Sequence, residues 1–184
     1  MLRNLETKAL PLEGALVITP QESKDERGCF FKYYAEEPLK KFGIALHFSE
    51  GYISVSKKNV LRGLHYQAAP FTQAKLVQCI HGAVYDVVVD LRKSSPTFRR
   101  WSGMVLSREN LAALYVPRGF AHGFVARTAN ATLLYHVDNL YSAQHGRGIL
   151  WSDPELGIDW GVKAPTLNGR DRAWPLLSRA EFFD

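Results

Sequence analysis

The stretch NVLRGLHYQ, from Asn59 to Gln67, has the pattern of a β-strand but carries an arginine, a histidine and a glutamine. Side chains on a strand alternate between its two faces, so a regular strand places Arg62 on one face and His65 on the other. A strand on the protein surface explains the polar side chains but leaves Leu61 and Leu64 badly placed. A strand that lines a wet cavity explains both sets, and we predict this arrangement.

Short β-rich runs extend in both directions from this stretch and are separated by turns about every eight to twelve residues, a spacing typical of an all-β sandwich or barrel. The runs are GALVITP (14–20), CFFKYY (29–34), HFSEGYISVS (47–56), AKLVQCIHG (74–82), AVYDVVVDLR (83–92), RRWSGMVLS (99–107), AALYVPRG (112–119), HGFVARTA (122–129) and ATLLYHVDNLY (131–141). The best helix candidate is AEEPLKKFG (35–43). We predict one domain over residues 1–184, with the tail 153–184 wrapped over the barrel.

Composition narrows the class of protein. The chain of 184 residues is 46% apolar and 22% charged, as in an ordinary globular domain, and 23 basic against 18 acidic residues give a net charge of +5. The basic residues are scattered, which argues against a nucleic-acid-binding patch. No window approaches the ~18 consecutive apolar residues of a membrane span. Two cysteines make no disulfide framework, and the N-terminus lacks a signal-type apolar core, so we expect a cytoplasmic protein.

The histidines first suggest a metal site, because imidazole is the commonest metal ligand. The segment PRGFAH, which ends at His122, resembles the second motif of cupin jelly rolls. The first cupin motif needs a His-x-His pair, whereas here His65 is followed two residues later by Gln67, and a protonated Lys75 cannot be a ligand. We therefore predict a cupin-like jelly-roll barrel with a few short helices and no metal. Metal analysis of the purified protein tests the alternative, a metal-dependent oxygenase.

Proton transfer at carbon is the second chemical hypothesis. It needs a base of near-neutral pKa, an acid on the opposite side of the substrate and a cation for the developing enolate oxygen. His65, Lys75 and a tyrosine of LLYHVDNLY suit these roles. Taken alone, each is more often structural: a satisfied strand histidine, a solvated lysine, a core tyrosine. Their joint occurrence on barrel strands favours the catalytic interpretation.

Six segments in a fixed order carry a family resemblance. They are KDERGCFF (24–31), SVSKKNVLRGLHYQ (54–67), QAKLVQCIHGAVYDVVVDLRKSSPTF (73–98), LYVPRGFAHGF (114–124), YHVDNLYSAQHGRGILWSDPELGIDW (135–160) and GRDRAWPLL (169–177). Together they resemble the dTDP-4-dehydrorhamnose 3,5-epimerase family, from about Gly14 to Leu177. The resemblance implies a nucleotide-diphosphate 4-keto-6-deoxy sugar as substrate. Its C4 carbonyl acidifies the hydrogens on C3 and C5, so one base can act at either carbon without a cofactor.

The resemblance also implies roles for individual residues. The catalytic residues it implies are the base His65, its partner Asp171, the enolate cation Lys75 and the acid Tyr135. The substrate-binding residues it implies are Arg27, Arg62, His122, Tyr141, Gln67 and Glu50. Members of the family exchange N-terminal strands between subunits, so we expect a homodimer. The early strand GALVITP supports this expectation, because it is more apolar than a strand exposed to solvent at a sheet edge should be.

Four positions depart from the family pattern, namely Lys32, Glu50, Tyr52 and Arg170. Glu50 and Tyr52 fall where the family usually has Gln and Asn, in a segment that faces the nucleotide sugar. They leave open the nucleotide, the sugar and whether one or both carbons are inverted. The alternatives are a single-carbon epimerase or ketoisomerase acting on another nucleotide 4-keto sugar, and a barrel that only binds a sugar nucleotide.

Overall fold

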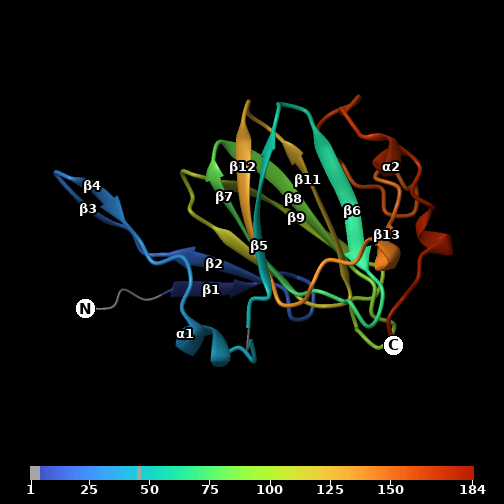
Figure 1. The fold of residues 1–184 in the computed structure, drawn as a ribbon, viewed down its shortest axis with the longest axis horizontal. Helices are drawn as coiled ribbons and strands as arrows, with labels where there is room; N and C mark the ends of the chain where they lie inside the picture. Colours follow the sequence, from blue (N-terminus) through green and yellow to red (C-terminus); the bar gives the residue numbers. More distant parts are fainter. Residues whose placement is uncertain (1–4, 45–46) are drawn as a thin grey trace.

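The computed structural model describes residues 5–44 and 47–184, which form two antiparallel sheets packed on each other (Figure 1). The six-stranded sheet contains, in spatial order, β1 (Leu5–Ala9), β2 (Leu16–Pro20), β10 (Ala113–Val116), β7 (Lys75–His81), β12 (Ala131–Val137) and β5 (Glu50–Ser56). The five-stranded sheet contains β13 (Gly146–Gly148), β6 (Leu61–Gln67), β11 (Phe120–Ala126), β8 (Ala83–Asp90) and β9 (Trp101–Ser107). This layout confirms the all-β, cupin-like jelly roll.

Strand β8 of the five-stranded sheet is apolar on both faces because both of its faces are covered. Along β8, Val84 and Val88 point into the core between the two sheets, where they join Phe124 of β11. Val87 and Val89 point outward and join a second core. Alternation along a pleated strand therefore explains why β8 is a nearly continuous valine run without being a helix.

The outer faces of the two sheets are covered by different parts of the chain. The C-terminal segment crosses the five-stranded sheet and packs Ile149, Trp160 and Leu177 on it. It contains the short helices η1 (Ala143–His145), α2 (Gly169–Arg172) and η2 (Leu177–Arg179). Helix α1 (Glu36–Lys40) covers part of the six-stranded sheet through Leu39. Both the predicted helix and the predicted wrapping of the tail are confirmed.

The alternation of a regular strand does not hold across residues 59–67. Arg62 pairs with Phe124 and His65 pairs with His122, so β6 has one more residue than β11 between these pairs. This β-bulge puts Arg62 and His65 on the same side, where both line one pocket. Gly63 permits it, because its φ of +144° favours glycine and a Cβ atom there would lie 2.5 Å from the Cα atom of Gly123.

Of the two strands predicted near the N-terminus, one needs correction. CFFKYY forms only the short β4 (Gly28–Phe30), which pairs with β3 (Ser23–Asp25) in a hairpin that projects from the body (Figure 1). GALVITP forms β2, which confirms the predicted strand, and it does not lie at an edge, because β1 pairs with its outer side. Neighbours on both sides and the cover of α1 explain its apolar side chains.

Candidate active site

A pocket of about 240 Å³ lies between the two sheets and is closed on one side by the segment around α2. The six-stranded sheet contributes Lys75 from β7 and Tyr135 from β12 to its wall. The five-stranded sheet contributes His65 from β6 and His122 from β11. The remaining lining residues are Tyr52, Ser54, Arg62, Phe124, Asn168, Arg170 and Asp171. The four predicted catalytic residues therefore share one cavity, although His65 and Asp171 are 106 positions apart in the chain.

His65 and Asp171 form a hydrogen-bonded pair, with 2.5 Å between His65 Nε2 and Asp171 Oδ1. The Asp171 side chain is 1% exposed, and α2 holds it in place because Asn168 Oδ1 accepts the Asp171 backbone N–H at 2.7 Å. Burial lowers the pKa of the His65 imidazole, and the Asp171 hydrogen bond opposes this shift. The ring is therefore neutral at pH 7. Its Nε2 atom already makes the hydrogen bond to Asp171, so Nδ1 is the nitrogen free to take a proton.

Lys75 and Tyr135 face this pair from the other sheet, and both are buried. Burial lowers the pKa of Lys75 to about 8, against the opposing attraction of Asp86. Burial also raises the pKa of Tyr135 well above its ordinary value, and the negative charge of Asp86 adds to the shift. At neutral pH the pocket therefore offers an ammonium group and a protonated phenol opposite a neutral imidazole.

A second histidine–carboxylate pair forms the back of the pocket. His122 Nε2 lies 2.8 Å from Asp86 Oδ1, and both residues are almost fully buried. Asp86 Oδ2 has no hydrogen-bond partner among the described residues. Sequence reasoning missed Asp86, although a carboxylate in the middle of the valine-rich run AVYDVVVD was a usable signal, because an unpaired buried charge is costly.

One aromatic and two basic side chains complete the cavity wall. Tyr52 pairs with Tyr135 across β5 and β12, and the two rings stack at 4.7 Å between centroids. Arg62 donates from Nε to Ser56 Oγ at 3.1 Å, which holds the guanidinium at the pocket rim. Arg170 lines the same pocket from α2, so two arginines stand at its entrance.

A smaller hollow of about 130 Å³ continues from the pocket and shares Tyr52, His65, Lys75 and Arg170 with it. Tyr141 and Gln67 also line this hollow. The Gln67 amide is used inside the protein, because Nε2 donates to the carbonyls of Phe71 and Leu140 and Oε1 accepts the Ser142 N–H. 

Glu50 lies just outside both cavities. Its two carboxylate oxygens each lie 3.2 Å from the backbone N–H of Tyr141, so it holds the loop that carries that tyrosine. Neither cavity wall includes Glu50.

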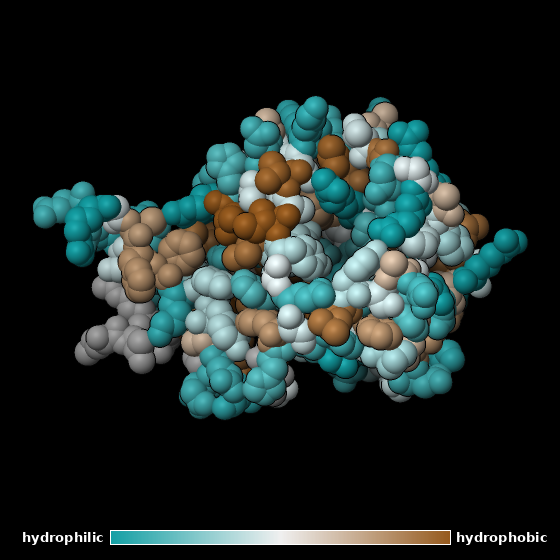
Figure 2. All heavy atoms as spheres, viewed as in Figure 1, coloured by the Kyte–Doolittle hydropathy of each residue, from teal (hydrophilic) through white to brown (hydrophobic). Residues whose placement is uncertain are grey.

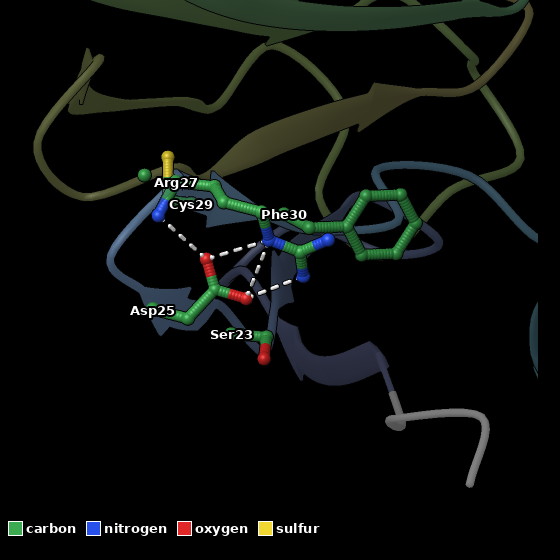
Figure 3. A pocket seen from close by; sticks show the side chains of 6 residues that line it. Ser23, Asp25, Arg27, Cys29 and Phe30 are labelled. Carbon is green, nitrogen blue, oxygen red and sulfur yellow. Dashed lines mark hydrogen bonds and ion pairs between the residues drawn. The ribbon is translucent and has the colours of Figure 1, made fainter.

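Arg27 is a second predicted site residue that this chain does not bring to the pocket. It lies in the β3–β4 hairpin beside an open hollow of about 390 Å³. Figure 3 shows its guanidinium turned toward Asp25, with 2.5 Å between Nη2 and Oδ2. The Arg27 side chain is 85% exposed, so it is accessible to another molecule.

The described part of the chain contains no group of three or more His, Cys, Asp or Glu side chains placed to hold a metal ion. His65 and His122 each direct Nε2 to a carboxylate, and Gln67 binds a loop. Within the same described residues, no helix is long and apolar enough to cross a membrane.

Comparison with known proteins agrees with this geometry. A family model described as dTDP-4-dehydrorhamnose 3,5-epimerase matches residues 9–179. The chain belongs to the dTDP-4-dehydrorhamnose 3,5-epimerase family. The dTDP-4-dehydrorhamnose 3,5-epimerase of Salmonella typhimurium is 46% identical over 171 residues, which are 92% of this chain and 93% of that protein.

Solved structures of dTDP-4-dehydrorhamnose 3,5-epimerases share the fold. The enzyme of Bacillus anthracis, solved with TDP and PPi bound, is 42% identical with a TM-score of 0.92, over 95% of this chain and all 100% of that one. The dTDP-6-deoxy-D-glucose-3,5-epimerase of Legionella pneumophila, in complex with dTDP-4-keto-L-rhamnose, is 37% identical with a TM-score of 0.92, over 97% of this chain and 95% of that one.

Proposed function

We propose that this chain is a cofactor-independent epimerase that inverts C3, C5 or both of dTDP-4-dehydro-6-deoxyglucose, with His65 as the base and Tyr135 as the acid. The observation that carries the proposal is that His65 projects from the five-stranded sheet while Lys75 and Tyr135 project from the six-stranded sheet into the same pocket. A sugar ring between the sheets meets a base on one face and an acid on the other, as inversion requires.

The first step is removal of a proton from the carbon next to the C4 carbonyl. His65 Nδ1 takes the proton, and its electron pair moves onto the C4 oxygen to give an enolate. Asp171 holds the imidazole through Nε2 and stabilises the imidazolium that forms. No redox step occurs, because only protons move and the electron pair of the broken C–H bond stays on the sugar. After each turnover, solvent takes the proton from His65 and returns one to Tyr135.

The second step needs a cation at the enolate oxygen and a proton from the opposite face. Lys75 suits the first role, since it lines the cavity and, with a pKa of about 8, it still carries a positive charge at neutral pH. Tyr135 suits the second, because its raised pKa keeps the phenol protonated until the carbanion needs it. Arg62 and Arg170 at the entrance are suited to the pyrophosphate, whose oxygens match planar guanidinium donors.

The decisive experiment offers dTDP-, CDP- and GDP-linked 4-keto-6-deoxy sugars to the enzyme in heavy water and locates deuterium by NMR. Deuterium at C3 or C5 with inverted configuration supports the epimerase, and the labelled carbons show whether one or both are inverted. A protein that only binds the sugar nucleotide incorporates no deuterium. A product with the carbonyl moved to another carbon identifies a ketoisomerase.

The pH dependence of kcat/KM should be bell-shaped. Lys75 loses its positive charge as pH rises through about 8, which removes the enolate cation and lowers the rate on the alkaline side. His65 becomes protonated as pH falls through its lowered pKa, which removes the base on the acid side. Rates measured from about pH 5 to about pH 10 check both limbs. Persistence of the alkaline limb in Lys75→Met would assign it to another group.

The proposal includes a homodimer with exchanged N-terminal strands. The projecting hairpin exposes 73% of Phe30, and β5 exposes 59% of Ile53 and 58% of Val55 on the outer face of the six-stranded sheet. Figure 2 shows hydrophobic side chains gathered over the region of β5 and β7, close to the base of the hairpin. A second copy of the chain is suited to cover this surface and to receive Arg27 in its own pocket.

Light scattering at micromolar concentration should therefore report twice the chain mass of 20.8 kDa. Replacing both Ile53 and Val55 by Lys should shift the protein to monomer, because two buried charges at an interface are costly. The matched control is Val105→Lys, on the exposed β9 of the other sheet, which should stay dimeric. A wild-type protein that scatters as a single chain would contradict the dimer.

A complementation assay tests whether Arg27 acts in the partner's pocket. Arg27→Ala and His65→Asn should each be impaired alone. In mixed dimers, the pocket with an intact His65 receives Arg27 from the other subunit, so about a quarter of all pockets should be active after random pairing. Mixing that restores no activity would place Arg27 outside the partner's site.

A further inference from the structure

Trp174, just after α2, touches both members of the catalytic pair. Its indole N–H donates to Asp171 Oδ1 at 3.3 Å, the same oxygen that faces His65. Its ring meets the His65 ring edge-on, with 6.1 Å between centroids and 68° between planes. No role for Trp174 followed from the sequence, where it is one aromatic residue in the tail.

The surroundings of Trp174 are shaped to keep the indole in this position. Gly148 of β13 lies opposite His65 of β6, and a Cβ atom at Gly148 would overlap the indole ring. The absence of that side chain therefore leaves the space that the ring fills. On the other side, the Arg170 guanidinium lies 5.6 Å from the centroid of the Trp174 ring.

The hydrogen bonds to the Asp171 carboxylate are unevenly shared. Oδ1 accepts from both His65 and Trp174, whereas Oδ2 is buried and has no partner among the described residues. A carboxylate with one bare buried oxygen attracts a proton strongly, and each donor to the other oxygen reduces that attraction. Among the described residues, the indole N–H is thus the neutral donor that shares Asp171 Oδ1 with the imidazole.

We propose that Trp174 is a positioning residue for this reaction: its indole N–H fixes Asp171 Oδ1 toward His65 and moderates the strength with which the carboxylate draws the imidazole proton. The proposal rests on the proposed function of His65 as base. It differs from a purely packing role, because packing by the ring alone leaves the proton affinity of His65 unchanged.

Several other charged or titratable groups face His65, and they set the background for any test. Asp171 and Arg170 belong to α2, Lys75 to β7, and His122 to the neighbouring β11. Tyr135 and Tyr52 face it from β12 and β5 across the pocket. A change confined to the indole N–H leaves all of these in place, so a shift in the titration of His65 reports on Trp174.

Trp174→Phe keeps an aromatic ring and removes the donor. Asp171 then attracts the proton on His65 more strongly, so the acid limb of kcat/KM should move to higher pH by about half a unit. At pH values on the acid side of that limb, kcat/KM should be roughly threefold lower than in the wild type. On the plateau it should change little. The matched control is Trp101→Phe, which removes an indole donor to the Leu156 carbonyl away from the pocket and should leave the limb in place.

NMR titration of the imidazole in ¹³C-histidine-labelled free enzyme, assigned with His65→Asn, measures the same shift without substrate. An unchanged titration of His65 in Trp174→Phe would overturn the proposal. A shifted titration combined with full activity of His65→Asn would keep the coupling and overturn the proposed base instead.

A measurement on the unmodified enzyme covers the case in which Trp174→Phe does not fold. In ¹⁵N-tryptophan-labelled protein, the indole signal of Trp174 should follow the protonation of His65 with the same midpoint. The other three tryptophans, Trp101, Trp151 and Trp160, are internal references, since Trp101 and Trp160 donate to backbone carbonyls. A Trp174 signal that is flat through the titration of His65 would show that the ring only packs.

Discussion

His65→Asn should abolish both deuterium exchange and epimerisation, with a loss of rate of roughly 10² to 10⁴ that is typical of a removed general base. The substitution keeps a polar side chain next to Asp171 but removes the only nitrogen free to accept the substrate proton. Binding of dTDP, measured by calorimetry, should be largely retained, because the proposed pyrophosphate contacts are Arg62 and Arg170 rather than His65. Solvent exchange at the wild-type rate in this variant would show that another residue is the base.

Two companion variants sharpen this result. Asp171→Asn should also lower the rate severely, because an amide favours the wrong tautomer of His65 and removes the charge that supports the imidazolium. His136→Asn is the matched control, since His136 is on β12 but contacts Tyr33 and Phe48 outside the pocket. That variant should keep both exchange and inversion.

Tyr135→Phe should lose inversion by a comparable factor, roughly 10² to 10⁴, while exchange with solvent persists or slows less. His65 can still remove and return a proton on its own face of the sugar when the acid on the other face is missing. As a mere core residue, Tyr135 would lose at most one hydrogen bond, ~1 kcal/mol of stability, and keep its activity. Deuterium incorporation and product configuration measured on one sample separate these outcomes.

Tyr115→Phe is the matched control for this prediction, because Tyr115 is a half-buried tyrosine of β10 that packs on the outer face of the six-stranded sheet. It should invert its substrate normally. Complete epimerisation by Tyr135→Phe would remove Tyr135 as the acid, and Tyr141 at the rim of the smaller hollow would become the next candidate.

Local patterns in the sequence were sufficient for the fold class. Strand runs bounded by glycine, proline and charged turns depend on interactions between near neighbours, so β5 through β12 could be predicted from them. The helix at Glu36–Lys40 was predictable for the same reason, since two glutamates precede a lysine that pairs with them. The single-domain assignment for residues 1–184 follows from the same reasoning and stays a prediction.

Side-chain direction on β6 was not predictable from alternation. The bulge at Gly63 depends on how closely β11 approaches, and that approach is possible because Gly123 faces Gly63 across the two strands. No pattern within residues 59–67 contains this information. The same holds for β2, whose place inside the sheet depends on the pairing of β1.

The sequence by itself determined that this chain forms a β-barrel with a histidine, a lysine and tyrosines on its strands, and the resemblance of its motifs indicated their chemistry. The pairing of His65 with Asp171 was implied by the resemblance, and the structure adds its geometry across 106 residues. Only the tertiary structure decided that Asp86 supports His122, that Trp174 shares the oxygen of Asp171, and that Arg27 points away from its own pocket. The physical reason is that such contacts join segments distant in the chain, and their geometry is set by packing of the whole barrel rather than by the preferences of neighbouring residues.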